Sequence, residues 1–162
     1  LIELFLYLAL VGVVAVVTTN AIIILHRTIA TFRVERRLTA GAEIAVRRIA
    51  REIRLAEQVY ASSPLGISPG VLSLDSAESE SDATAKDVWV GIVGGALVIR
   101  RGGGEALKLT GNGVMVSRLA FWKIDNASTS QAVKLEMTLV AANGEVVRAR
   151  DYFITIVLRG AY

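Results

Sequence analysis

The feature that most constrains this chain is a run of 22 uncharged residues, 4–25, close to the beginning of the sequence. A helix rises about 1.5 Å per residue, so this run spans roughly 33 Å and matches the hydrocarbon core of a bilayer, about 30 Å. Its side chains are apolar all round, which favours lipid or other helices on every side. We therefore predict that residues 1–25 form a transmembrane or helix-core segment. A signal peptide is disfavoured, because no basic residues precede the run and no small-residue cleavage site follows it.

The remaining residues read as ordinary globular sequence in a chain of 162 residues with a net charge of +3. The absence of cysteine excludes disulfides, thiolate metal sites and a cysteine nucleophile. The single histidine, His26, excludes a zinc cage or a Ser-His triad in the globular part. No nucleophile, base and oxyanion donor can be combined from the motifs, so we expect no enzyme, no cofactor and no metal.

Residues 26–60 contain no proline and continue the helical pattern of the apolar run. Apolar residues recur there at steps of three and four, which predicts an amphipathic helix with one stripe that faces a core: Ala42, Ala45, Ile49, Ile53, Ala56 and Tyr60. We expect one helix of more than 50 residues, in which Thr18, Thr19, Asn20 and Gly41 are places where the helix could bend or loosen.

Eight arginines make residues 26–60 strongly basic. A solvated face beside a membrane anchor explains such a charge run, and attraction to nucleic acid or to an anionic surface is the alternative. The candidate contact residues for that alternative are Arg33, Arg36, Arg37, Arg47 and Arg48.

Residues 61–162 read as a series of short strands separated by glycine-containing turns. The expected strands are 71–74, 88–93, 96–101, 106–109, 115–124, 132–141 and 146–158. Gly94-Gly95 and Asn143-Gly144 each predict a hairpin. Residues 133, 135, 137 and 139 are apolar and alternate with polar residues, so one face of the sheet must be buried. We predict an α+β fold, in which the long N-terminal helix packs on an antiparallel sheet head.

Four other motifs favour structural roles over chemistry. The acidic run Asp75–Asp82 lacks the spacing of a calcium loop and reads as a solvated loop. Gly102–Gly104 lacks the lysine of a phosphate-binding loop and reads as a turn. Asn126-Ala-Ser128 matches a permissive glycosylation pattern. Aromatic residues on strands are more often core or interface than stacking platforms for ligands, and this applies to Trp89, Phe121 and Trp122.

The start Leu1-Ile2-Glu3-Leu4, followed by an aliphatic run with Gly12, resembles the mature N-terminus of type IV pilins and pseudopilins. The resemblance implies cleavage by a prepilin peptidase before a Phe-Thr-Leu-Ile-Glu-Leu-type start, with two residues ahead of Leu1. It also implies that Glu3 neutralises the terminal ammonium of a neighbouring subunit. The assembly residues are then Leu1, Ile2, Glu3, Leu4 and Gly12. Two features depart from many pilins: Asn20 replaces a helix-bending proline, and the C-terminal cysteine pair is missing.

The strand segments look like those of the J-type minor pseudopilins, for example in residues 87–90 and 119–122. The resemblance implies a structural filament subunit that is anchored in the inner membrane before assembly and extracellular afterwards. Its partners would be copies of itself or other pilins, and the assembly machinery. The alternatives are a J-type tip subunit of a secretion or competence pilus, a pilin that adheres to DNA or surfaces, and a lone membrane-anchored domain. Basic residues after an apolar span usually stay cytoplasmic, whereas the resemblance places the head outside, and we follow the resemblance.

Overall fold

The computed structural model describes residues 1–60, 62–76, 87–125 and 131–158. Within these ranges one helix, α1 (Ile2–Leu55), is followed by eight strands, which confirms the predicted α+β class. The strands are β1 (Ala56–Val59), β2 (Leu72–Ser76), β3 (Asp87–Val93), β4 (Ala96–Arg101), β5 (Leu107–Lys108), β6 (Val114–Asp125), β7 (Gln131–Asn143) and β8 (Val146–Val157).

Helix α1 runs without a break through Gly41 and is 54 residues long. It ends five residues earlier than the predicted Tyr60, because Ala56 adopts extended backbone and begins β1. Strand β1 pairs antiparallel with β2, with Val59 opposite Leu74. Ala56 and Val59 are buried in this strand. At Ala56, pairing with β2 therefore prevails over the helical spacing that placed this residue on the stripe of the helix.

The strands form two antiparallel sheets, where the sequence predicted one. The first sheet has five strands in the order β1-β2-β3-β4-β5, and the second has three in the order β6-β7-β8. Both predicted hairpins are present. Gly94 and Gly95 have positive φ between β3 and β4, and Gly144 has positive φ between β7 and β8. A positive φ in the turn matches the twist of the paired strands, and glycine adopts it without steric cost.

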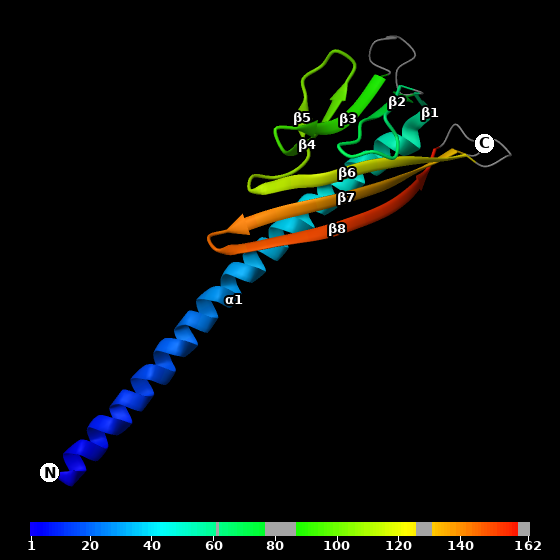
Figure 1. The fold of residues 1–162 in the computed structure, drawn as a ribbon. Coiled ribbons are helices and arrows are strands. Elements are labelled where there is room, and N and C mark those ends of the chain that lie inside the picture. The colour runs from blue at the N-terminus through cyan, green and yellow to red at the C-terminus, as the bar shows by residue number, and fades with distance from the viewer. Residues whose placement is uncertain (61, 77–86, 126–130, 159–162) are drawn as a thin grey trace.

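The core lies between α1 and the sheets, and the three-stranded sheet runs along the helix (Figure 1). The alternating apolar residues of β7 are at most 1% exposed, as the pattern predicted: Val133, Leu135, Met137 and Leu139. From the helix, the buried residues follow one stripe: Val34, Leu38, Ala42, Ala45, Ile49 and Ile53. Tyr60 lies beyond the helix and is half-buried, so it does not extend this stripe.

Backbone hydrogen bonds join the two sheets and cover the free edge of β6. The Val116 N–H donates to the carbonyl oxygen of Gly95, in the β3–β4 turn, at 2.8 Å. The N–H groups of Gly66 and Gly70 donate to Phe121 and Leu119 of β6 at 2.8 and 2.7 Å. The opposite edge of this sheet is β8, which pairs with β7 along its whole length.

The aromatic residues divide between the core and the surface. Phe121 is fully buried, whereas Trp122 is 37% exposed. The Trp89 ring is half-buried, and the Arg100 guanidinium carbon lies 5.7 Å from its centroid. Residues 102–104 form the turn between β4 and β5, as predicted. Most of the acidic run 75–82 and the pattern 126–128 lie outside the described residues.

Candidate membrane and assembly helix

The first half of α1 projects from the head as a rod without a covering layer (Figure 1). Every residue from Leu1 to Ile29 is exposed, whereas burial begins at Val34. The helix is long and apolar enough to cross a membrane, and none of its most apolar window is buried by the rest of the chain. An exposed apolar surface of this size is stable only when lipid or other protein covers it.

Four threonine hydroxyl groups on and just beyond the projecting rod are satisfied within the helix. Thr18 and Thr19 donate to the carbonyl oxygens of Val14 and Ala15, four residues back, at 2.8 and 2.9 Å. Thr28 and Thr31 make the same bond at 2.9 and 3.0 Å. An unsatisfied hydroxyl is costly in hydrocarbon, so these bonds make the threonines compatible with a lipid environment.

Four of the five predicted assembly residues lie together at the N-terminal end of the rod. Leu1 to Leu4 form its first turn, where the Phe5 N–H donates to the Leu1 carbonyl oxygen at 3.3 Å. Glu3 is exposed there, and a carboxylate in the first turn interacts favourably with the helix dipole. Gly12 is two turns further on, and no atom lies within 4 Å of a Cβ added there. None of these residues is in contact with the head, so any packing role must involve another molecule.

The predicted basic contact residues differ in how free they are. Arg33, Arg36 and Arg37 are exposed, while Arg47 forms an ion pair with Glu43. Arg48 is half-buried, and its Nε lies 3.0 Å from Oε1 of Glu52. The structure therefore leaves the first three as the accessible group and gives the last two intramolecular partners.

Glu52 is a structural residue that the sequence analysis missed. It is fully buried, and its second oxygen accepts a hydrogen bond from Arg101 of β4 at 2.6 Å. The carboxylate thus links α1 to the five-stranded sheet through Arg101, while Arg48 of the same helix is its second cationic partner. Its spacing of four residues from Arg48 was visible in the sequence, but nothing local in the sequence pairs it with Arg101.

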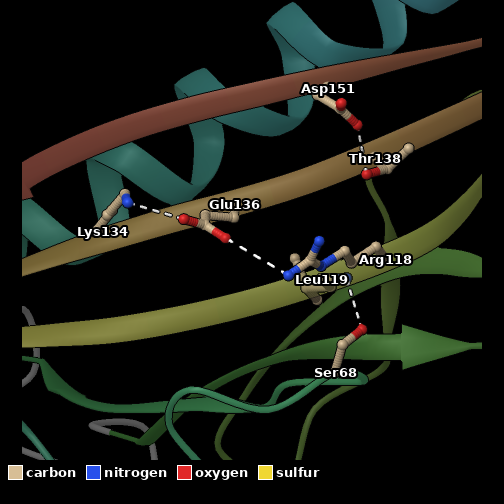
Figure 2. Close-up of polar contacts among 7 residues, drawn as sticks. All are labelled: Ser68, Arg118, Leu119, Lys134, Glu136, Thr138 and Asp151. Carbon is tan, nitrogen blue, oxygen red and sulfur yellow. Dashed lines mark hydrogen bonds and ion pairs between the residues drawn. The ribbon is translucent and has the colours of Figure 1, made fainter.

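The outer face of the three-stranded sheet carries a ladder of polar contacts (Figure 2). Lys134 Nζ lies 2.8 Å from one oxygen of Glu136, and Arg118 lies 4.0 Å from the other. Lys134 is the main reason that the pKa of Glu136 is lowered, and Trp122 and Arg118 contribute. The Thr138 hydroxyl donates to Asp151 at 2.7 Å on the neighbouring strand. These contacts stabilise a solvent-facing surface, on which several of the same residues line a small hollow of about 50 Å³.

A depression of about 350 Å³ lies on the five-stranded sheet, beside Tyr60, Asp87, Trp89 and Arg100. The Tyr60 hydroxyl donates to Asp87 at 2.8 Å. This hydrogen bond, burial and the charges of Asp75 and Asp87 raise the pKa of Tyr60 to about 12, so the phenol is a poor acid. Within the described ranges, no group of three or more His, Cys, Asp or Glu could hold a metal ion.

Comparison with known proteins adds no relative to this picture: no family model, no curated protein and no solved structure matches the chain. The architecture itself, a long apolar N-terminal helix packed on antiparallel sheet, is compatible with a pilin-like fold. The apolar helix is likewise compatible with membrane anchoring.

Proposed function

We propose that this chain is a structural subunit of a type IV pilus or a related filament. The observation that carries the proposal is the division of one unbroken helix into two environments. Its C-terminal half supplies the buried stripe of the head, while residues 1–29 are exposed and contain the uncharged, mostly apolar run 4–25. A rigid connection between an apolar rod and a folded head suits a subunit that polymerises through the rod.

The apolar surface of the rod would be covered by lipid before assembly and by neighbouring subunits afterwards. Lipid covers it while the subunit is anchored in a membrane. When assembly machinery extracts the subunit, equivalent apolar surface must replace the lipid, and rods of neighbouring subunits provide that surface. The filament would then have a core of packed helices with the α+β heads outside.

Glu3 is the residue to which we assign axial register. Moving its carboxylate from the membrane surface into a helix core removes water, which is costly unless a cation replaces it. The amino-terminal ammonium of an adjacent subunit is such a cation, as the pilin resemblance implies. Prepilin peptidase and the inner membrane are partners before assembly in this scheme.

The test is the substitution Glu3→Ala, expressed in cells that contain filament-assembly machinery. We expect a folded head and few filaments by electron microscopy. Glu35→Ala is the matched control, because Glu35 is an exposed glutamate further along α1. Ordinary filament numbers from Glu3→Ala would contradict the proposal and favour a lone membrane-anchored domain. Abundance in purified filaments would separate a major subunit from a J-type tip subunit.

DNA or surface adhesion is a second candidate, supported by the exposed arginines at 33, 36 and 37. Binding through arginine and phosphate should weaken steeply as salt rises. Replacing the three arginines with glutamine should reduce both the affinity for DNA and its salt dependence, while Arg118→Gln on the outer face of the three-stranded sheet should not. Weak binding by the unaltered chain, without steep salt dependence, would exclude this candidate.

A further inference from the structure

The tip of the β7–β8 hairpin and helix α1 enclose a cleft of about 340 Å³ near the base of the head. Arg27 and Thr31 of the helix line one side, and Glu145, Val147 and Arg148 of the hairpin line the other. Figure 1 shows the β7–β8 turn at the end of the head from which the rod projects. The hairpin tip therefore lies beside the part of α1 where the rod joins the head.

The cleft has a defined height relative to the apolar run. Arg27 follows Leu25 by two residues, which is about 3 Å along the helix axis. When residues 4–25 fill the hydrocarbon layer, Arg27 lies at its surface, where the phosphate groups of the lipids lie. Because Arg148 lines the same cleft, the hairpin brings a second guanidinium to the same level.

The charges in the cleft match one phosphodiester. Within the described part of the chain, neither Arg27 nor Arg148 forms an ion pair with a carboxylate. Glu145 also lines the cleft, so two guanidinium groups and one carboxylate leave one net positive charge. Guanidinium groups bind phosphate oxygens through paired, charge-assisted hydrogen bonds.

The residues beside the cleft also suit a head whose hairpin tip faces the membrane. Arg150, two residues beyond Arg148, points to the helix and donates to the Thr39 hydroxyl at 3.5 Å. Val147 is 58% exposed at the hairpin tip, where an apolar side chain can enter the upper acyl region. The hairpin thus offers apolar and cationic groups side by side, which suits a membrane surface.

We infer that this cleft binds the headgroup phosphate of an anionic phospholipid and so fastens the head to the membrane surface before assembly. The inference rests on the membrane-anchored stage of the proposed function. It identifies a binding site that combines α1 with a hairpin from the far end of the sequence, rather than a general attraction of the basic helix.

The experiment reconstitutes the chain into vesicles of phosphatidylcholine, with or without phosphatidylglycerol. Flotation reports membrane insertion, and native mass spectrometry counts the phosphatidylglycerol molecules that remain bound after gentle release. The test variant is Arg27→Gln with Arg148→Gln. The control, Arg33→Gln with Arg36→Gln, removes the same number of positive charges. Both of its residues lie on α1 and outside the cleft. We expect the test variant to retain phosphatidylglycerol roughly 30-fold more weakly, as for two arginines at an anionic surface, and the control to change little.

The possible results separate this inference from the proposed function. A chain that floats with neither vesicle would contradict the membrane-anchored stage itself. Flotation with equal retention by the original chain and the test variant would overturn the headgroup site alone, and so would equal losses in the test and control variants. Retention of phosphatidylcholine as strong as that of phosphatidylglycerol would also overturn it. Arg27→Lys with Arg148→Lys keeps the charge and should restore most of the retention, which guards against loss through misfolding.

Discussion

Glu52 illustrates how a single buried charge can determine the position of two elements. The carboxylate is fully buried, while the side chains of Arg48 and Arg101 are 35% and 37% exposed. Each arginine can turn toward water if its partner is lost, but the carboxylate cannot reach water without opening the contact between α1 and β4. Removing the arginines should therefore lower the free energy of unfolding more than removing the charge of Glu52.

This inequality predicts the order of two sets of variants. Replacing both arginines with methionine keeps their packing and leaves Glu52 buried without a cation, which should cost about 3–5 kcal/mol of unfolding free energy. Glu52→Gln should cost only about 1 kcal/mol, because both arginines can then be solvated. Denaturant unfolding of the chain in mild detergent, followed by tryptophan fluorescence, measures both. A larger cost for Glu52→Gln than for the double methionine variant would refute this account.

Tyr60 provides a test with a defined pH range. Its hydrogen bond to Asp87 raises its pKa from 10.0 to about 12, so the folded state favours the neutral phenol. The resulting stabilisation is complete below pH 10 and is lost as the pH rises toward 12. Ultraviolet titration should show a phenolate that forms late and is absent from Tyr60→Phe. In Asp87→Asn the same step should move toward pH 10, and an unchanged step would show that Asp87 is not the cause.

At the scale of elements, Gly41 lies inside α1 without any need for its flexibility. A Cβ at this position would lie 3.7 Å from the Val114 side chain, which is ordinary contact. Gly41→Ala should therefore stabilise the head by about 0.5–1 kcal/mol, since alanine favours the helix. At Gly70 an added Cβ would lie 3.0 Å from the Leu119 carbonyl oxygen, so Gly70→Ala should destabilise. Thermal unfolding by circular dichroism checks both; a lower midpoint for Gly41→Ala would indicate that the helix bends there.

The elements that could be predicted from sequence are those with local signals. The hairpins at Gly94-Gly95 and Asn143-Gly144 and the buried face of β7 depend on neighbouring residues, and all three are confirmed. The predicted end of α1 was wrong, because Ala56, which the helical spacing assigns to the stripe, begins strand β1 instead. The division into two sheets was also missed, since it depends on contacts such as Val116 with Gly95 that no periodicity records.

The candidate site shows the same distinction. The apolar rod could be predicted from the sequence, because residues 4–25 form one continuous uncharged run. The cleft at the base of the head could not be predicted, because Arg27 and Arg148 lie near opposite ends of the sequence and meet only through the β7–β8 hairpin. The Glu52–Arg101 pair could not be predicted either, because its two residues are far apart in the sequence.

At the scale of the whole molecule, α1 is both the rod and the central core element of the head. Its buried residues extend from Val34 to Ile53, and its exposed large apolar residues lie between Leu1 and Phe32, with Ile44 as the one exception. A force or a displacement applied to the rod is therefore transmitted directly to the core of the head. This coupling distinguishes the chain from a domain attached to an anchor by a flexible linker.

Gly12 tests whether rods pack against one another. In the single chain the space around it is open, so Gly12→Leu should leave membrane insertion and the folded head unchanged. If helices approach closely at this glycine in a filament, the added side chain should sharply lower filament numbers in electron micrographs. Ala21→Leu adds similar bulk two and a half turns along, on the opposite side of the helix, and should have a smaller effect. Wild-type filament numbers from Gly12→Leu would place the close contact elsewhere on the rod.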